Sequence, residues 1–280
     1  MAVDNTVSKF SGTIYVTWTH FTTLTDVIWL SKSTNHGVTW SPPIQVNPRE
    51  QNGIVQGSQI AVGPDGSVYV AWGFGDEACG GGTYCQHFVA KSTDGGKTFG
   101  AAVPMAPAFM PLSFFSSYRI NSFPSLAVSP VAGKDFVYDI YPTQNGANSR
   151  IAFVRSTTPG GVTFTPPVSV NDSKVGQRCM PAVTVDTTGV AHLSWFDSRN
   201  GFSADTLDIF ATFTKNNGAT FAPNARLTSG LINATDAQFI GDYSGIAASP
   251  SGLTRYAHPV WTNGGLSANG QLSTATLTLP

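Results

Sequence analysis

The chain has 280 residues with 29 glycines, 18 prolines and only 11% charged residues, which fits one large all-β domain with a sizeable core. Its formal net charge is −1 and it has no Lys/Arg cluster, so neither nucleic acid nor an anionic membrane surface is expected as a partner. No run approaches about 18 consecutive apolar residues, so no membrane span is expected.

Five units with the same order of strands follow one another along the chain. Alternation of apolar with small or polar residues marks the strands. The expected strands cover 2–4, 13–18, 27–30 and 44–46; 59–62, 68–72, 87–90 and 102–105; 125–128, 136–140, 151–154 and 168–170; 182–185, 191–195, 208–211 and 225–227; and 245–248, 256–261 and 272–277. The fifth unit lacks a fourth strand. A period of about 60 residues suits a four-stranded propeller blade.

One short motif occurs four times, after the third strand of the first four units. It spans 92–99 (STDGGKTF), with variants at 33–40 (STNHGVTW), at 156–164 with one inserted residue, and at 214–221 (TKNNGATF). A hydroxyl residue is followed by Asp or Asn in most copies, then by Gly, and by Thr before an aromatic residue. Such a string can close a tight hairpin, because Asp or Asn bonds its own backbone and Gly takes the positive-φ position.

This motif resembles the Asp-box (BNR repeat) of the sialidase-like β-propeller superfamily, and the resemblance extends over most of the chain. It implies an all-β propeller of four-stranded antiparallel blades, with the boxes on the face away from the binding site. We expect one domain over 1–280, with blades at about 1–57, 58–122, 123–180, 181–243 and 244–280. Sialidases of the family have six blades, so two alternatives stay open. One is a five-bladed ring, which we favour because an open propeller would expose a strand edge; the other is a longer protein that has lost its beginning.

Two of the three cysteines are expected to form a disulfide. Cys79 and Cys85 flank a glycine-rich loop that can bring the sulfur atoms together. The bond would stabilise the fold by about 2.4 kcal/mol, and it agrees with a secreted protein, although the first residues carry no signal peptide. The alternatives are two free thiols or a metal site with His87, whose spacing fits no common ligand pattern. We expect no metal and no cofactor, and a buried Cys179.

Long loops carry the residues that could do chemistry. The loops that join an outer strand to the next inner strand cover 48–58, 107–124, 172–181 and 229–244. In a propeller they share one face with the loops between second and third strands, and long loops on a rigid scaffold often hold function. The aromatic residues of 107–124, including Phe109, Phe114, Phe115 and Tyr118, could stack on sugars or anchor the loop.

The resemblance implies a sialidase site: an arginine clamp around a sugar carboxylate, a tyrosine nucleophile paired with a glutamate, and an acid that donates a proton. The candidates for the substrate-binding group are Arg119, Arg178, Arg49, Arg199, Asp197 and Tyr118; those for the catalytic group are Tyr243, Glu50 and Asp242, with Glu77, Asp76 and Asp197 as alternatives. The string 118–121 (YRIN) is nearest to the family's Phe/Tyr-Arg-Ile-Pro motif, but it lies mid-chain and has Asn121 in place of Pro.

Each candidate also has a structural alternative. The arginines could pair with neighbouring acids, Tyr243 could pack at the channel mouth, and 197–201 could be a turn with a local ion pair. We therefore expect a secreted protein directed at a glycan or glycoconjugate. It would be an exo-glycosidase acting on acidic sugars, a non-catalytic module that binds glycan or protein, or one part of a larger secreted protein. Three arginines converging on one carboxylate site would favour the enzyme, and arginines paired with separate acids would favour binding.

Overall fold

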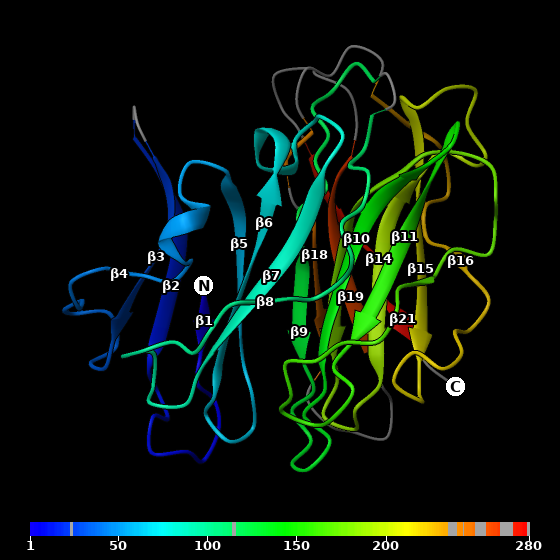
Figure 1. The fold of residues 1–280 in the computed structure, drawn as a ribbon. Coiled ribbons are helices and arrows are strands. Elements are labelled where there is room, and N and C mark those ends of the chain that lie inside the picture. The colour runs from blue at the N-terminus through cyan, green and yellow to red at the C-terminus, as the bar shows by residue number, and fades with distance from the viewer. Residues whose placement is uncertain are drawn as a thin grey trace.

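The computed structural model describes residues 1–22, 25–113, 116–234, 240–242, 244–249, 256–263 and 271–278. They form five antiparallel sheets that succeed one another in chain order (Figure 1). Only two short 3-10 helices occur in this part of the chain, η1 (Arg49–Gln51) and η2 (Asp76–Cys79). No helix among the described residues is long and apolar enough to cross a membrane.

Each sheet begins with an inner strand and adds its neighbours in sequence order. The first sheet has β1 (Ala2–Val3), β2 (Ile14–Phe21), β3 (Asp26–Ser33) and β4 (Ile44–Gln45). The second has β5 (Val55–Val62), β6 (Val68–Gly75), β7 (Cys85–Ser92) and β8 (Val103–Pro104). The third has β9 (Ser125–Val128), β10 (Val137–Asn145), β11 (Asn148–Arg155) and β12 (Val168–Ser169).

The fourth sheet has β13 (Arg178–Val185), β14 (Ala191–Asp197), β15 (Thr206–Thr214) and β16 (Ala225–Arg226), and β17 (Ile232–Asn233) pairs further along β15. The fifth has β18 (Gly245–Ala248), β19 (Tyr256–Asn263), β20 (Gln271–Thr274) and β21 (Leu277–Thr278). Both β20 and β21 pair with β19 in one continuous register, so they are two parts of a third strand. The prediction of five antiparallel units is confirmed, and the fifth sheet has no fourth strand position within its described residues.

Two inner strands begin earlier than predicted. β5 begins at Val55 rather than at residue 59, and β13 begins at Arg178 rather than at residue 182. In both strands the pairing register shifts at this point, between Gln56 and Gln59 in β5 and between Cys179 and Ala182 in β13. A bulge leaves residues unpaired and interrupts the alternation of side chains, so the periodicity does not show that the strand continues beyond it.

Apolar clusters fill the spaces between consecutive sheets. The second strands carry aromatic residues whose rings enter these clusters, and their side chains alternate between the two faces of each sheet. Trp72 of β6 packs toward the first sheet with Tyr15 and Leu30, and Trp195 of β14 packs toward the third sheet with Ile140 and Phe153. Burial of such aromatic side chains supplies much of the hydrophobic stabilisation that holds sheet against sheet.

The repeated motif forms the turn between third and fourth strands in the first four sheets, and we call 33–40, 92–99, 156–164 and 214–221 the box turns. In the second, the Ser92 hydroxyl accepts the N–H of Gly96 (2.9 Å), and the Asp94 carboxylate accepts the hydroxyl of Thr98 (2.6 Å). Gly96 has a φ of +70°, which favours glycine. The turn at 156–164 differs, because the Ser156 hydroxyl donates to the Thr158 carbonyl instead.

Replacing Asp94 with Asn is expected to make the free energy of unfolding fall less steeply as the pH is lowered. The hydroxyl and N–H of Thr98 hold the pKa of Asp94 well below its usual value, against a smaller effect of burial. A lowered folded-state pKa gives stabilisation that is complete above the unfolded value, about 4, and is lost as the pH falls through the folded value. Asn35 and Asn216 already occupy this position and donate to Thr hydroxyls, so Asp94→Asn should fold. Thermal unfolding from neutral pH to pH about 2 measures the effect; an unchanged acid slope would contradict it.

Candidate functional site

A polar pocket lies beside the start of β11, at the end of the third sheet opposite its box turn. The outer strand β12 ends at Ser169, and the Val170 N–H still donates to the Ile151 carbonyl of β11 (2.9 Å). The chain over 171–177 then bows away from β11 before it enters β13. The Asn171 side chain holds this segment in place, because its carbonyl accepts the N–H of Ile151 (2.9 Å) and its amide donates to the Ser173 carbonyl (2.6 Å). The early end of β12 therefore leaves space at the edge of β11, and the pocket measures about 430 Å³.

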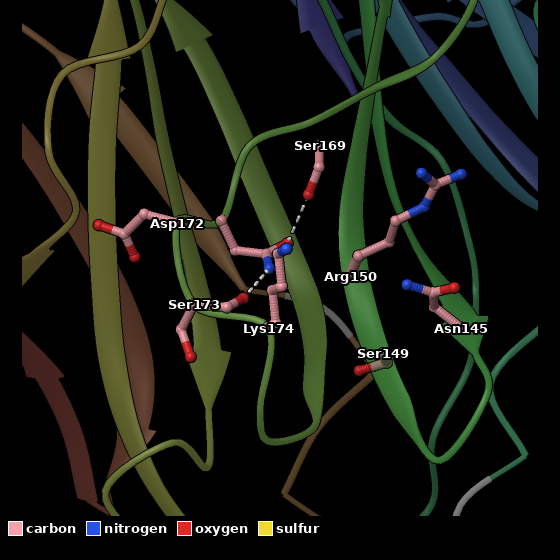
Figure 2. Close-up of a pocket in the computed structure, with 8 residues that line it drawn as sticks. Asn145, Ser149, Arg150, Ser169, Asp172, Ser173 and Lys174 are labelled. Carbon is pink, nitrogen blue, oxygen red and sulfur yellow. Dashed lines mark hydrogen bonds between the residues drawn. The ribbon is translucent and has the colours of Figure 1, made fainter.

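Polar side chains line this pocket (Figure 2). Hydroxyls, amides and charged groups come from the β10–β11 hairpin on one side and from the bowed segment on the other. The lining residues are Asn145, Ser149, Arg150, Ser169, Asn171, Asp172, Ser173 and Lys174. A pocket of this size can hold a small ligand, and hydroxyl, amide and charged groups are donors and acceptors suited to a hydrophilic one.

Arg150 lines this pocket and differs from most of the other arginines in its hydrogen bonding. Its side chain is half-buried, and no hydrogen bond or ion pair joins its guanidinium to any other residue that the structure describes. Lys174 likewise has no such partner in the described part of the chain. Among the described arginines only the exposed Arg49 shares this property with Arg150. Arg150 thus offers a planar fork of donors at the pocket.

The predicted residues Arg178, Arg199 and Asp197 do come together, next to this pocket. The Asp197 carboxylate accepts from Arg178 Nε (3.0 Å) and from two nitrogens of Arg199 (3.0 and 2.7 Å), and also from the indole N–H of Trp195 (2.9 Å). The side chains of Arg178 and Asp197 are both 0% exposed. The arginines therefore converge on a carboxylate of the protein itself, away from solvent.

The remaining donors of Arg178 are also used inside the protein. They reach the carbonyls of Ser149 (2.7 Å), Gly176 (2.8 Å) and Val175 (2.5 Å), so this side chain ties the bowed segment to the ends of β11 and β13. Burial lowers the pKa of Arg178, and the charge of Asp197 offsets part of this effect. The Arg178 side chain is fully buried, so none of its donors is exposed at the pocket. Arg178 instead holds the loop that precedes β13 through the carbonyls of Val175 and Gly176.

Arg199 extends the cluster to the pocket wall. Its second terminal nitrogen contacts the Asp172 carboxylate (2.5 Å). Burial works to raise the pKa of Asp172, but the hydrogen bonds from Arg199 and from the N–H of Asn224 outweigh it and lower that pKa. Burial works to lower the pKa of Arg199, and its bonds to Asp197 and Asp172 reverse this, so that the pKa is raised. The paired Asp172 is thus a fixed anion turned toward Arg199.

Two further predicted residues are partners of each other. Arg119 Nε donates to Asp242 Oδ1 (2.8 Å), and a terminal nitrogen of Arg119 contacts Asp242 Oδ2. The Asn121 amide also donates to the Asp242 carbonyl (3.1 Å). This bidentate pair joins the loop that follows the second sheet to the segment that precedes the fifth. The candidate clamp arginine and the candidate acid therefore neutralise one another.

Tyr118 anchors its loop in a core between the fourth and fifth sheets. Its side chain is 3% exposed, and its hydroxyl donates to the Ala204 carbonyl (3.1 Å). Burial raises the pKa of this hydroxyl. The Ser117 hydroxyl adds a bond to Asp205 (2.8 Å). Of the two functions predicted for the aromatic residues of this loop, the structure places Tyr118 in the anchoring one; Phe114 and Phe115 lie outside the described residues.

The other catalytic candidates are spread over the molecule or lie outside its described part. Arg49 and Glu50 are exposed on η1, between the first two sheets. Tyr243 and the side chain of Glu77 lie outside the described residues. Asp76 accepts the N–H groups of Thr83 (2.7 Å) and Tyr84 (3.1 Å), and the Thr83 bond lowers its pKa. Asp76 thus closes the loop that contains the cysteines.

The predicted disulfide between Cys79 and Cys85 is confirmed, and Cys179 is buried as a free thiol. His87 lies close to both sulfur atoms, but its ring nitrogens contact Asp139 Oδ2 (2.7 Å) and the Ser122 carbonyl (2.8 Å). With the sulfur atoms bonded to each other and both nitrogens engaged, these three residues are not arranged to hold a metal ion.

The comparisons agree with the fold. No protein-family model and no curated protein sequence matches the chain. Solved structures are similar at low identity. The Hadza microbial sialidase Hz136 superposes with a TM-score of 0.57 at 10% identity, covering 91% of this chain and 53% of its own, so this chain spans about half of that protein.

Two further solved structures are similar over most of their length. The Penicillium chrysogenum α-L-arabinanase complexed with arabinobiose has a TM-score of 0.55 at 15% identity, covering 95% of this chain and 90% of its own. The GH93 α-L-arabinofuranosidase of Fusarium graminearum has a TM-score of 0.56 at 13% identity, with the same coverage. At these identities the likeness shows the fold alone, an arrangement of antiparallel sheets that this chain shares with these neighbours.

Proposed function

We propose that the protein is a glycan-binding module that takes an acidic sugar in the pocket beside β11, without catalysing its hydrolysis. The observation that carries the proposal is the half-buried Arg150 guanidinium, which has no acceptor among the described residues and lines a pocket of hydroxyls and amides. A guanidinium that is partly withdrawn from water gains from an anion that restores its hydrogen bonds. A carboxylate or sulfate on a sugar would supply this anion.

The surrounding groups suit the rest of a sugar. Asn145 lies near Arg150 on the β10–β11 hairpin, and Ser173 and Lys174 lie on the bowed segment opposite (Figure 2). The Ser149 hydroxyl is buried and already bonds the backbone of Arg178. Amides and hydroxyls both donate and accept, so they can bond the hydroxyl groups that every sugar presents. Lys174 adds a second positive charge that would favour an anionic over a neutral glycan. The fold of glycan-active neighbours agrees with a glycan as ligand.

The pairing of the other arginines supports binding over hydrolysis. Arg178 and Arg199 share Asp197, and Arg119 is paired with Asp242, so three free arginines do not converge on one open site within the described residues. A sialidase clamp needs guanidinium donors directed at the substrate carboxylate. Here those donors are occupied by carboxylates and carbonyls of the protein.

The test is calorimetric titration of the protein with sialyllactose, with a glucuronate-containing oligosaccharide and with lactose. Binding of an acidic glycan and weaker or absent binding of lactose is the expected result. Arg150→Ala should weaken binding by about tenfold to a hundredfold, because a bond to a charged group contributes about 1.5–3 kcal/mol. Lys97→Ala removes an exposed cation from a box turn at the other end of the sheets and is the matched control. Equal affinity of Arg150→Ala and the parent would exclude this pocket.

A hydrolysis assay with a fluorogenic sialoside distinguishes a binding module from an exo-glycosidase. We expect no turnover by the parent protein, because its candidate acid Asp242 is neutralised by Arg119. Asp242→Asn, Glu50→Gln and Tyr243→Phe variants would be assayed beside it. If the parent turns over the sialoside and folded Asp242→Asn and Tyr243→Phe variants do not, the protein is an exo-glycosidase and the proposal of a binding module is wrong.

A further inference from the structure

Phe202 is a fully exposed aromatic residue in the turn between β14 and β15. This turn covers 198–205, and we call it the aromatic turn. The Phe202 side chain is 96% exposed, although burying a phenylalanine typically contributes about 1.5–3 kcal/mol. Single exposed apolar residues are common on proteins, so the role of this ring depends on what surrounds it.

Hydrogen bonds fix the backbone of the aromatic turn. The Gly201 N–H donates to the Ser198 carbonyl (2.9 Å). The Thr206 hydroxyl accepts the N–H of Phe202 (2.8 Å). A Cβ at Gly201 would lie 2.1 Å from the Thr206 carbonyl oxygen, so only glycine fits at this close approach. The Phe202 ring therefore projects from a backbone that is ordered before any ligand binds, which lowers the entropy cost of binding.

The aromatic turn packs against the bowed segment, which lines the pocket beside β11. The Ser198 N–H donates to the Gln177 carbonyl (2.9 Å), and the Ser198 hydroxyl accepts the N–H of Gln177 (2.8 Å). A Cβ at Gly176 would lie 3.0 Å from Arg199 Cα, so the two backbones are in direct contact. Arg199 also contacts Asp172 in the pocket lining (2.5 Å). The pocket wall and the aromatic turn are thus parts of one packed unit.

Lys174 and Val175 lie between the pocket and the aromatic turn. Lys174 lines the pocket and Gly176 contacts the turn, so Val175 lies between them along the chain. The Val175 carbonyl accepts a hydrogen bond from Arg178 (2.5 Å), while its side chain is 62% exposed. The surface therefore changes from cationic at Lys174 to apolar at Val175 and Phe202.

We propose that an acidic glycan bound at Arg150 continues over Val175, and that the Phe202 ring stacks on the face of a sugar unit further along the glycan. This inference rests on the function proposed for the pocket. The C–H face of a pyranose ring is apolar, so stacking would remove both this face and the exposed aromatic ring from water. The ligand would then be an acidic oligosaccharide or polysaccharide that extends beyond its charged unit, rather than a single acidic sugar.

The size of the apolar surface favours a glycan chain over other kinds of ligand. An aromatic side chain offers about 150–250 Å², whereas a stable protein interface covers about 800 Å² on each partner. The sequence also has no Lys/Arg cluster that would hold an anionic membrane surface. One aromatic ring beside a polar, cationic pocket instead matches one sugar ring beside a charged one.

The test is calorimetric titration with a disaccharide, a tetrasaccharide and a hexasaccharide of alternating glucuronate and N-acetylglucosamine. The affinity of the parent should rise with length. Phe202→Ala should weaken binding of the hexasaccharide about threefold to tenfold, the effect of one aromatic contact, and should leave binding of the disaccharide unchanged. Phe202→Trp should keep the rise with length. Phe21→Ala is the matched control, because Phe21 is a 60% exposed aromatic residue of the first sheet, and this variant should bind like the parent.

Arg150→Ala, titrated with the same three oligosaccharides, separates this inference from the function proposed for the pocket. If Arg150→Ala weakens binding at every length but Phe202→Ala binds the hexasaccharide like the parent, the pocket binds glycan and the stacking is wrong. An affinity of the parent that does not rise with length has the same meaning.

Two further results would overturn the inference. If Phe202→Ala weakens binding equally at all three lengths, the ring supports the pocket and does not contact the far end of the glycan. If the parent binds none of the three, no glycan chain of this kind reaches Phe202. If Arg150→Ala binds like the parent, the proposed pocket itself is wrong, and the inference is wrong with it.

Discussion

Replacing Asp197 with Ala is expected to lower the free energy of unfolding by about 3–5 kcal/mol, the usual cost of breaking a buried ion pair. Asp197 is the shared acceptor of Arg178 and Arg199, and Arg178 is fully buried. Without the carboxylate, two guanidinium groups would face each other, one of them without access to water. The loss should exceed that of Arg178→Ala, which leaves Asp197 still paired with Arg199.

Urea unfolding of the two variants beside the parent measures this difference. Asp242→Ala is the matched control, because it removes an aspartate paired with Arg119, whose side chain is 61% exposed. An exposed pair contributes about 0–1 kcal/mol. If Asp197→Ala cost no more than Asp242→Ala, the buried cluster would not hold the loop over 170–177 in the way we describe.

Replacing Tyr118 with Ala should cost about 3–5 kcal/mol, as for other large buried aromatic side chains. The ring fills the core that contains Leu112, Phe196 and Trp261, and its hydroxyl bonds the Ala204 carbonyl. Tyr118→Phe should cost only about 1 kcal/mol, because it keeps the ring and loses one hydrogen bond. The large effect thus comes from packing, and the loop over 116–123 should open before the sheets do.

Hydrogen exchange gives the specific readout for this loop. Tyr118→Ala should lose protection at the N–H of Ser117, which donates to Asp205 (2.7 Å), and at that of Ser122, which donates to the Cys79 carbonyl (2.9 Å). Exchange within β6 and β14 should change little. Unchanged protection at both N–H groups would show that the bonds to Asp205 and Cys79 hold the loop without the ring.

The strands were predictable because their pattern is local. An aromatic residue ends each of the second-strand strings IYVTW, VYVAW, VYDIY, AHLSW and AHPVW, and the box turns mark the ends of third strands. The disulfide was predictable for the same reason, since its two cysteines flank one short loop. Features that depend on a few adjacent residues could be recognised from the sequence.

The partners of the arginines depend on register and could not be recognised in that way. The sequence pattern predicts that Arg178 lies on a loop, but the bulge between Cys179 and Ala182 extends β13 and shifts its register by one residue, which brings Arg178 opposite Asp197. The contact between Arg119 and Asp242 depends on where two long loops meet. The sequence shows residue types, whereas these pairings require the path of the chain.

The pocket was missed because its central residue lies in a strand. Arg150 is the third residue of β11, which follows the turn at Gly146 and Ala147, whereas the sequence predicts functional residues on the long loops. The guanidinium of Arg150 is available because β12 ends at Ser169, the second residue that pairs with β11. The length of an outer strand depends on how it packs, and the alternation of apolar and polar residues in the sequence does not show where it ends.

The second-strand tyrosines Tyr69 and Tyr138 each donate a hydrogen bond to the box turn of the following sheet, and these bonds have a consequence for folding during synthesis. The Tyr69 hydroxyl can form its bond only after Gly160 has been synthesised, 91 residues later. The Tyr138 hydroxyl likewise requires Asn217, 79 residues later. A sheet that has just left the ribosome can pair its strands but cannot cover its own aromatic face. Since chains fold as they are made, about one further sheet must emerge before each one is sealed. A pause in translation within a unit would therefore leave an apolar face exposed on the unit before it.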